Sequence, residues 1–406
     1  MGHGYAARSR RARVPGHPKV LVAISVGMGY GRDMIAGIVS YARAHGPWEF
    51  IGQVGPDVQA AAIAQAPRYD GVIFHQMGPG AVEVALARGA PAVSVGGEAP
   101  TPGIPHVTAD SDAVARMAFD YYRRLGFSRF ATYGGNPQVR TRRIEVFAML
   151  AREAGFLCTD LGPGSRHQWF NANENRLWDR EIRKLKRELP KLDGRVAVFA
   201  WSSEEARPIV AACDELGIDV PDHIAVLGVD DDEAICELAN PPISAIDHGC
   251  ETIGWEAARI LDAIMHGKPP DAAMVRVDPV RVVVRQSTNT LAIDDPMVVE
   301  SVQFIRTNFA EGITVGDVLD ASDVSRPTLE QHFKRALGRT IHRQITIERM
   351  EHAKELLHST ELSLAAISTR CGFSYPSKFS TAFRRETGVS PSEYRQRGRS
   401  YQSNLR

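Results

Sequence analysis

The sequence has few cysteines, no long apolar run and no excess of charge of either sign. Its five cysteines are an odd number, and no two of them form a CxxC pair. We therefore expect neither a disulfide framework nor a structural zinc site. We also expect the protein to work in a reducing, cytoplasmic setting. No apolar run approaches the ~20 residues that a membrane-spanning helix needs. The short apolar stretch at residues 20–26 has no small-residue cleavage site after it, which predicts a strand rather than a signal peptide.

Net charge is also missing, because 48 Lys and Arg balance 48 Asp and Glu over 406 residues. This balance would argue against a nucleic-acid partner if the charges were spread evenly. They are not: residues 326–406 hold 15 basic against 7 acidic side chains, whereas residues 291–325 hold 1 against 7. A compact basic segment releases counterions when it binds a phosphate backbone. The C-terminal part of the chain is therefore a candidate for binding nucleic acid.

The length of the chain predicts two to four domains, and its composition, 44% hydrophobic and 24% charged, is typical of folded protein. Residues 1–18 carry four arginines and no acid. Two interpretations of this segment stay open: a basic arm that touches phosphate, or a disordered leader of the kind common at termini.

From residue 19 to about residue 284, short Val- and Ile-rich runs alternate with amphipathic helical stretches. The runs expected to be strands lie at 20–26, 48–54, 71–75, 92–95, 129–133, 196–200 and 224–227. The stretches expected to be helices lie near 32–45, 58–66, 112–125, 141–154, 174–189 and 204–216. The runs do not alternate with polar residues, as expected for parallel strands covered on both faces. We predict a doubly wound α/β region, long enough for two lobes.

The chain changes fold class after a polar stretch, residues 287–297, that contains Pro296 and is a predicted linker. Beyond it only helical periodicity remains. The predicted organisation is a leader at 1–18, a two-lobe domain at 19–286, the linker, and an all-α domain at 298–406.

Two segments of the all-α domain repeat each other. Residues 315–338 and 364–388 each have a short amphipathic helix, a tight turn, and a serine, Ser325 or Ser374, predicted to cap a second, basic helix. The offset is 49 residues before the turn and 50 after it. This is the layout of a helix-turn-helix, whose second helix enters the major groove of DNA. Residues 342–359 predict one long helix that fixes the distance between the two reading heads.

The second copy, with Cys371-Gly372-Phe373 and Pro391-Ser-Glu-Tyr394, nearly matches a family pattern, and residues 301–395 resemble the AraC/XylS-type DNA-binding domain. The resemblance implies recognition helices at 326–335 and 376–385. The side chains expected to face the groove are Arg326, Thr328, Gln331, His332, Tyr375, Ser377, Lys378, Ser380 and Thr381. Those expected to hold phosphate are Lys334, Arg335, Arg384 and Arg385. Arg326 suits guanine and Gln331 suits adenine, and the apolar Leu329, Phe333, Phe379 and Phe383 are expected to pack the core.

Five phrases of the first domain resemble the LacI/GalR-type, periplasmic-binding-protein-like sugar sensor. They lie at residues 107–112, 125–131, 143–155, 220–231 and 241–246. The N-terminal helix-turn-helix of that family is missing, and the C-terminal domain takes its place. This combination, over residues 19–400, resembles the xylose operon regulators.

Ligands of open α/β sheets bind beyond the carboxyl ends of the strands, which in two lobes face a shared crevice. The candidate ligand-binding residues at such positions are Tyr30, Arg32, Asp33, His75, Asp110, Arg143, Trp201 and Asp230. Arg143 and Asp230 match the family's ligand positions most directly. Alternatives stay open: Asp230 as a cap, and His75 and Trp201 as packing residues. Where the family often has Asn-Asp or Thr-Asp this chain has Ser202-Ser203, so the contact implied there is lost or replaced by hydroxyls.

Two other classes of protein are disfavoured. An enzyme is disfavoured because no GxSxG, HExxH, P-loop or spaced Cys/His set is present, and Gly27-Met-Gly29-Tyr-Gly31 lacks the third glycine of a dinucleotide loop. A solute-binding transport protein is disfavoured because the C-terminal domain would have no role in it. We therefore expect no catalytic residue, cofactor or metal.

The resemblance implies a regulator that binds double-stranded promoter DNA and a small sugar, acts with RNA polymerase, and forms a homodimer. We expect an activator of a D-xylose, or related pentose, catabolic operon. The alternatives are a different small ligand and a repressor.

Overall fold

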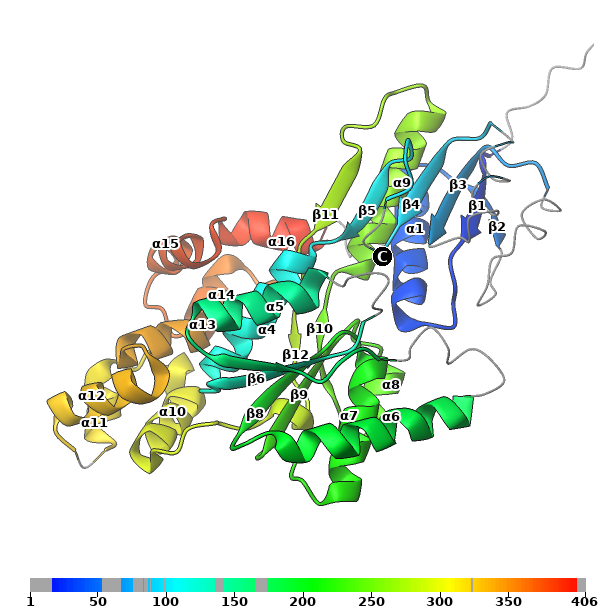
Figure 1. Cartoon of the computed structure of the whole chain (residues 1–406). Coiled ribbons are helices and arrows are strands. Elements are labelled where there is room, and N and C mark those ends of the chain that lie inside the picture. The colour runs from blue at the N-terminus through cyan, green and yellow to red at the C-terminus, as the bar shows by residue number, and fades with distance from the viewer. Residues whose placement is uncertain are drawn as a thin grey trace, which may run out of the picture.

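The computed structural model describes residues 17–52, 67–75, 83, 87, 89–97, 100–135, 142–164, 174–322 and 324–399. Within these ranges the chain forms two six-stranded sheets and a helical module (Figure 1). No helix of this part of the chain could span a membrane. The predicted leader, apart from its last two residues, and the helix predicted near 58–66 lie outside the described residues.

The first sheet defines lobe 1. Its strand order is β11-β5-β4-β3-β1-β2, and every pair in it is parallel. The strands are β1 (Lys19–Ala23), β2 (Glu49–Gly52), β3 (Gly71–His75), β4 (Ala92–Val95), β5 (His106–Ala109) and β11 (Met274–Val277). Helices α1 (Gly29–His45) and α9 (Cys250–Met265) pack together against it, and their buried side chains share one core with β1, β3, β4 and β5.

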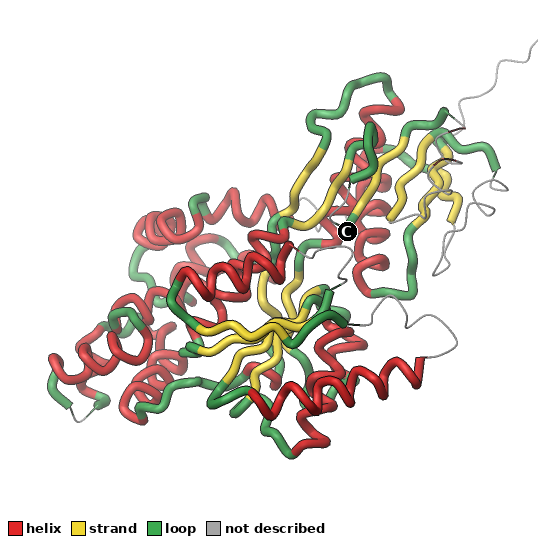
Figure 2. Tube along the Cα trace, in the orientation of Figure 1, coloured by secondary structure: helices red, strands yellow, loops and turns green. Residues whose placement is uncertain are grey.

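The second sheet defines lobe 2, with strand order β12-β10-β9-β8-β6-β7. The strands are β6 (Arg129–Tyr133), β7 (Leu157–Asp160), β8 (Val196–Ala200), β9 (Ile224–Val229), β10 (Ser244–Asp247) and β12 (Arg281–Val283). Only β12 runs antiparallel to its neighbour. The helices are α4 (Ser111–Arg124), α5 (Arg142–Glu153), α6 (Glu174–Glu188), α7 (Ser203–Leu216) and α8 (Glu233–Glu237), with 3₁₀ turns at Leu189–Lys191 and Gln286–Thr288. Figure 2 shows helices flanking the strands of both lobes.

The chain crosses between the lobes three times. It passes from β5 to β6 through α4, from β10 to β11 through α9, and from β11 directly to β12. At the hinge, the amide of Asp110 donates to the carbonyl of Val277, 2.7 Å away, so the first and third crossings lie side by side. The predicted fold class, a two-lobed and mostly parallel α/β domain followed by an all-α domain, is confirmed.

The helical module holds two helix-turn-helix units joined by a long helix. The first unit comprises α11 (Val315–Asp320) and α12 (Arg326–Leu337), and the second comprises α14 (Leu364–Arg370) and α15 (Pro376–Thr387). Helix α13 (Ile341–Ser359) joins them, and α10 (Pro296–Asn308), a 3₁₀ turn at Phe309–Glu311 and α16 (Pro391–Arg399) complete the module. The predicted core residues Leu329, Phe333, Phe379 and Phe383 are fully buried.

Two details of the helical module differ from the sequence expectations. Ser325 does cap α12, but its hydroxyl bonds Thr328 rather than a backbone amide. The second recognition helix begins at Pro376, as the resemblance implied, but its N-cap is Tyr375 and not the predicted Ser374. Pro376 at the first helical position explains why the residue directly before it is the cap, because proline favours that position and lacks the amide that would be unsatisfied there.

Residues 287–297 connect the sensor to the module, and their first part packs into lobe 2. Ser287 and Thr288 are fully buried, and the hydroxyl of Ser287 donates to the carbonyl of Val226 at 2.6 Å. The amide of Ala292 donates to the carbonyl of Leu125 at 2.8 Å. The helical module is therefore attached to lobe 2 by an ordered stretch.

Candidate ligand cleft and DNA-binding heads

Three of the predicted ligand residues meet at the carboxyl edge of lobe 2. Arg143 comes from α5, Trp201 follows β8 and Asp230 follows β9. The Arg143 guanidinium donates to the carbonyl of Trp201 at 3.2 Å, lies 3.7 Å from the Asp230 carboxylate, and stands 5.5 Å from the centre of the Trp201 ring. Asp230 adopts a positive φ of 85°, which turns the chain sharply at the strand end.

The Arg143 side chain is prepared for a further polar contact. Arg143 is only 9% exposed, and its Nε has no hydrogen-bond partner within the described structure. A buried donor without an acceptor is costly unless something else accepts from it. A ligand hydroxyl in the cleft would supply that acceptor, which argues for the binding role rather than for simple packing.

His248 is a member of this group that the sequence analysis did not single out. Its Nδ1 lies 3.0 Å from the Asp230 carboxylate, and its Nε2 lies 2.9 Å from the Cys250 sulfur. Burial raises the pKa of the Cys250 thiol well above its ordinary value. His248 follows β10 directly, so the rule of strand ends would have found it had that strand been assigned as a sheet member.

The other predicted group lies on lobe 1, at the start of α1 and the end of β3. The rings of Tyr30 and His75 are 5.1 Å apart, and Arg32 donates to the carbonyl of Val26 at 2.9 Å. Burial raises the pKa of Asp33 to about 6, and the negative charge of Asp247 acts in the same direction. Because Asp247 ends β10 in lobe 2, the charges on the two lobes act on each other.

Asp232 joins the two groups. This lobe 2 carboxylate accepts from the amide of Gly29 at 2.7 Å and lies 3.3 Å from the Arg32 guanidinium, both in lobe 1. A Cβ at Gly29 would lie 2.7 Å from Asp232, and one at Gly31 would lie 1.9 Å from the carbonyl of Ser25. Close packing thus requires glycine at position 31 and leaves little room for a side chain at Gly29, and the amide of Gly29, the first of α1, binds Asp232.

Asp110 and the Ser202-Ser203 pair, which the sequence analysis singled out, have structural roles. Asp110 caps α4, since its carboxylate accepts from the amide of Ala113 at 2.9 Å. Ser202 and Ser203 are buried: the Ser202 hydroxyl accepts from the amide of Glu205, and the Ser203 hydroxyl donates to the carbonyl of Val229. The Ser202 hydroxyl therefore caps α7, whereas the Ser203 hydroxyl ties the start of α7 to the end of β9.

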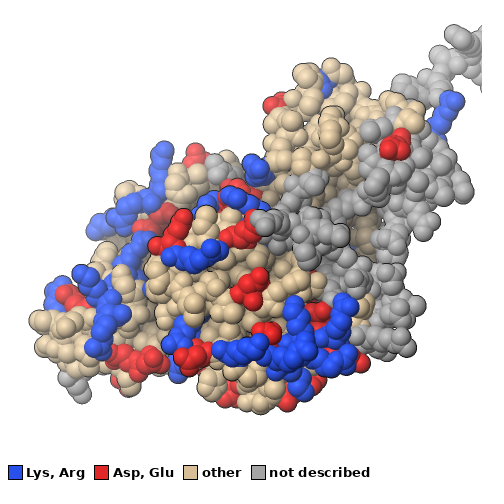
Figure 3. All heavy atoms as spheres, viewed as in Figure 1, with Lys and Arg blue, Asp and Glu red and all other residues tan. Residues whose placement is uncertain are grey.

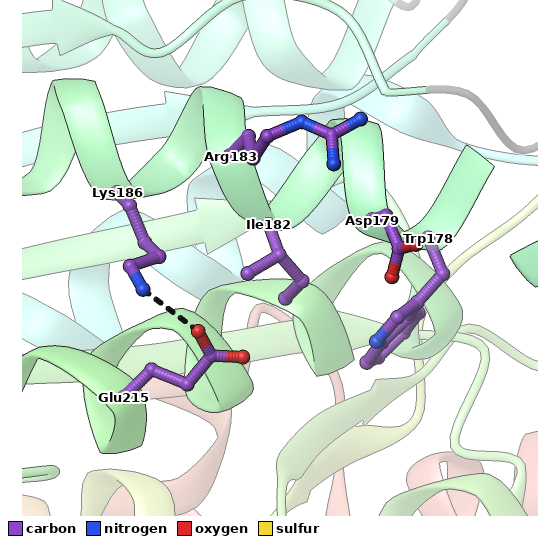
Figure 4. A pocket seen from close by; sticks show the side chains of 6 residues that line it. All are labelled: Trp178, Asp179, Ile182, Arg183, Lys186 and Glu215. Atoms are coloured by element: carbon purple, nitrogen blue, oxygen red, sulfur yellow. Dashed lines mark hydrogen bonds and ion pairs between the residues drawn. The ribbon is translucent and has the colours of Figure 1, made fainter. Parts of the chain in front are cut away.

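A separate hollow of about 300 Å³ lies on the outer surface of lobe 2, between α6 and α7 (Figure 4). Its lining residues are Trp178, Asp179, Ile182, Arg183, Lys186 and Glu215. None of them belongs to the cleft groups, and Trp178 was not a predicted ligand residue. In the described residues no group of three or more His, Cys, Asp or Glu could hold a metal ion.

The first reading head, α12, carries side chains that are engaged by other parts of the protein. Arg326 pairs with Glu330 at 2.9 Å. His332 and Arg335 lie 2.5 and 3.5 Å from the carboxylate of Asp295, the residue before α10. Gln331 and Lys334 are exposed. Of the six residues predicted to contact DNA in this head, Arg326, His332 and Arg335 therefore have acidic partners.

The second reading head, α15, is more open. Tyr375 is 61% exposed, and the Lys378 ammonium stands 5.5 Å from the centre of its ring. Arg385 has an acidic neighbour, Glu386, at 3.5 Å. The remaining predicted contacts are Ser377, Thr381 and Arg384, which are exposed, and Ser380, which is half-buried. Figure 3 shows Lys and Arg side chains over the helical module, and also along lobe 2 where α6 runs.

Comparison with known proteins agrees with this architecture. Residues 119–288 match the model of a periplasmic binding protein-like domain, and residues 319–397 match a helix-turn-helix domain. The xylose operon regulatory protein of Escherichia coli K12 is 30% identical over 390 residues, 93% of this chain and 96% of that protein. Its counterpart in Haemophilus influenzae is 28% identical over 93% of this chain and 98% of that protein.

A solved structure supports the same assignment over the whole chain. The structure of a xylose-binding transcription activator has a TM-score of 0.58 and 29% identity, covering 94% of this chain and 98% of that one. The two-lobed sensor and the paired reading heads define a transcription regulator, not an enzyme. The chain belongs to the family of xylose operon regulatory proteins.

Proposed function

We propose that this regulator binds a pentose, D-xylose first among them, in the cleft between its lobes and so controls a pentose-catabolic operon. The observation that carries the proposal is the grouping of Arg143, Trp201 and Asp230 on a chain that also bears two DNA-reading heads. Homologous regulators named for the xylose operon support the choice of sugar. The similar solved structure of a xylose-binding transcription activator supports activation rather than repression.

The cleft chemistry suits a small polyol. A guanidinium and a carboxylate 3.7 Å apart can bind adjacent hydroxyls, one as donor and the other as acceptor. Trp201 can cover the C–H face of the sugar ring. On lobe 1, Tyr30, Arg32, Asp33 and His75 complete the site when the lobes close. Asp110 remains a candidate through its carboxylate at the start of α4.

The heads bind double-stranded promoter DNA. We place α12 and α15 in successive major grooves, about one helical turn (~34 Å) apart. Arg326, Thr328, Gln331 and His332 read bases from α12, as Tyr375, Ser377, Lys378, Ser380 and Thr381 do from the second head. Lys334, Arg335, Arg384 and Arg385 hold phosphates. The protein works in the cytoplasm as a homodimer that contacts RNA polymerase, with the sensor at 19–286, a connector at 287–297 and the DNA-binding domain at 298–406.

Thermal unfolding with a sugar panel tests the ligand. D-xylose at 100 times its dissociation constant should stabilise the folded protein by about 2.7 kcal/mol. L-arabinose, D-ribose and D-glucose serve as matched comparisons. Stabilisation by another sugar alone would replace the ligand, and no response to any of them would contradict the sensor role. A reporter fused to the operon promoter separates activation from repression, because deleting the regulator lowers expression in the first case and raises it in the second.

A further inference from the structure

The sensor and the DNA-binding module meet at the last turn of α4. This helix starts at the hinge, where its N-cap Asp110 binds the backbone of β11, and its body packs in the core of lobe 2. Its C-terminal end faces α13, the helix that joins the two reading heads (Figure 1). One helix thus extends from the edge of the cleft to the spacer between the heads.

Arg339 makes the first of two polar contacts at this junction. It lies between α12 and α13, and its guanidinium donates to the carbonyls of Arg123 and Arg124 at 3.2 and 2.7 Å. Its Nε donates to the side chain of Gln344 in α13 at 2.6 Å. A guanidinium is a favourable cap for the carbonyls at a helix C-terminus. Burial lowers the pKa of Arg339 to about 10, so it remains charged at neutral pH.

An ion pair makes the second contact, two helical turns further along α13. The Arg124 guanidinium lies 2.7 Å from the carboxylate of Glu351, which also binds Lys354 at 2.9 Å. Burial raises the pKa of Glu351, but Arg124 and Lys354 outweigh it and hold the pKa below its ordinary value. Asp120, one turn before Arg124 on α4, adds a second carboxylate near Lys354. We call Arg339, Arg124 and Glu351 the α4–α13 clamp.

Further contacts between the helical module and the sensor indicate how a movement of the lobes would reach the two heads. The module touches the third crossing between the lobes, where the Tyr394 hydroxyl of α16 lies 3.5 Å from the carbonyl of Val280. His358, at the end of α13, lies close enough to Asp247 and Arg281 to feel their charges. The end of the first head and α13 are therefore fixed to lobe 2, while α16, which follows the second head, touches the segment that connects the two lobes. Movement of one lobe against the other would act on the two heads unequally.

We propose that the α4–α13 clamp couples the ligand state of the cleft to the relative placement of the two reading heads. This inference rests on the proposed function, and it assigns Arg339, Arg124 and Glu351 as positioning residues that contact neither sugar nor DNA. A polar junction suits this role, because interfaces between domains that move are more polar than obligate ones. An apolar junction of the same size would hold the module more firmly but would offer no second arrangement of similar energy.

The experiment measures DNA affinity with and without D-xylose for the wild type and for Glu351→Gln, Arg124→Gln, their double variant and Arg339→Lys. The DNA is a fragment selected for tight binding to the wild-type protein. Glu351→Gln preserves shape but removes the charge, and Arg339→Lys keeps the charge but loses the fork that spans two carbonyls. Arg129→Gln, which breaks the exposed pair with Asp193 elsewhere on lobe 2, is the matched control.

D-xylose should change the DNA affinity of the wild type by about 5–150-fold, the usual range of allosteric coupling. Each clamp variant should reduce this ratio at least about threefold. The double variant should lose no more than the larger single effect, since both changes remove one contact. Sugar affinity and sugar-free DNA affinity should stay within twofold of the wild type, as should every value for the control. An unchanged ratio in all the clamp variants, or an equal loss of DNA affinity with and without sugar, would overturn the coupling role.

Failure of the proposed ligand is distinguishable from failure of the clamp. If the wild-type protein binds DNA but ignores D-xylose, the ligand assignment fails by itself. Hydrogen exchange then tests the clamp without sugar: DNA binding should change amide exchange at the last turn of α4 in the wild type and much less in Glu351→Gln. Equal changes in the two proteins would refute the clamp.

Discussion

The cleft and the reading heads are both rich in charge, yet they arrange it in opposite ways. At the carboxyl edge of lobe 2 the charges are paired inside the protein, where the Arg143 guanidinium lies 3.7 Å from the Asp230 carboxylate and both side chains are nearly buried. In the second head, Lys378 and Arg384 project from an exposed helix face. Under the proposed function, the cleft exchanges an internal ion pair for contacts with a small neutral ligand, whereas the heads attract a polyanion.

This difference has a consequence for how each site responds to salt. Exposed basic groups bind phosphate with release of counterions, so DNA affinity falls steeply as salt rises. Buried pairs are screened much less. Raising salt should therefore weaken DNA binding while sugar affinity changes little, and variants of the two sites should separate the two activities cleanly.

The largest effect is expected from Arg143→Ala. Removing one partner of a buried pair leaves the Asp230 carboxylate poorly compensated and deletes the donor that faces the ligand, a loss of about 3 kcal/mol or more than 100-fold in sugar affinity. Titration calorimetry with D-xylose measures this effect. DNA affinity without sugar should stay within twofold of the wild type.

Arg142→Ala is the control for that prediction. Arg142 is the neighbouring residue, but it is exposed and pairs with Asp112 at 2.7 Å. Its removal should leave sugar affinity almost unchanged, because exposed ion pairs contribute ~0–1 kcal/mol. If Arg142→Ala and Arg143→Ala weaken sugar binding equally, burial does not select the ligand residue, and the contrast between the two regions fails.

A smaller effect is expected in the heads. Lys378→Ala should weaken DNA binding about tenfold, because loss of a base contact costs about 1–3 kcal/mol. Arg326→Ala should cost less, about threefold, because Arg326 is already paired with Glu330 and must give up that pair to bind DNA. Fluorescence anisotropy at three salt concentrations gives both values. Equal losses, or a loss of sugar affinity in either variant, would contradict the assignment.

The same contrast explains what the sequence could predict. The heads are local: each is contained in about 25 residues, and the duplication with its 49- and 50-residue offsets shows in the sequence. Buried Leu329 and Phe333 recur as Phe379 and Phe383, so the core followed directly from helical spacing. The start of α15 at Pro376 was predicted correctly, but its cap was assigned to Ser374 instead of Tyr375 because serine is the commoner cap.

The cleft is assembled from segments far apart in the chain, and this limited its prediction. Arg143, Trp201 and Asp230 were found because each lies at the end of a strand or on the helix after one. Asp232 was not predicted, because its role depends on a hydrogen bond from the amide of Gly29, which lies 203 residues away in the sequence. His248 and the β5 and β7 strands were missed too, because β5, β7 and β10 each have only two apolar residues among four and so form no apolar run.

The smallest predicted effect concerns the pH response of the cleft. Burial, reinforced by Asp247, raises the pKa of Asp33 from 3.8 to about 6, although Arg32 and His248 oppose the shift. Because the folded state holds this proton more tightly, the group costs stability above pH 6. The cost is absent below about pH 3.8 and grows as pH rises between those values. In urea titrations, Asp33→Asn should therefore gain stability relative to the wild type as pH rises from 5 to 7. The protonation state of Asp33 should also affect sugar binding, because an ionised carboxylate accepts hydroxyl hydrogen bonds better than a protonated one. D-xylose affinity should therefore rise about threefold between pH 5 and pH 7 in the wild type and stay constant in Asp33→Asn. An identical pH profile in both proteins would remove Asp33 from the site.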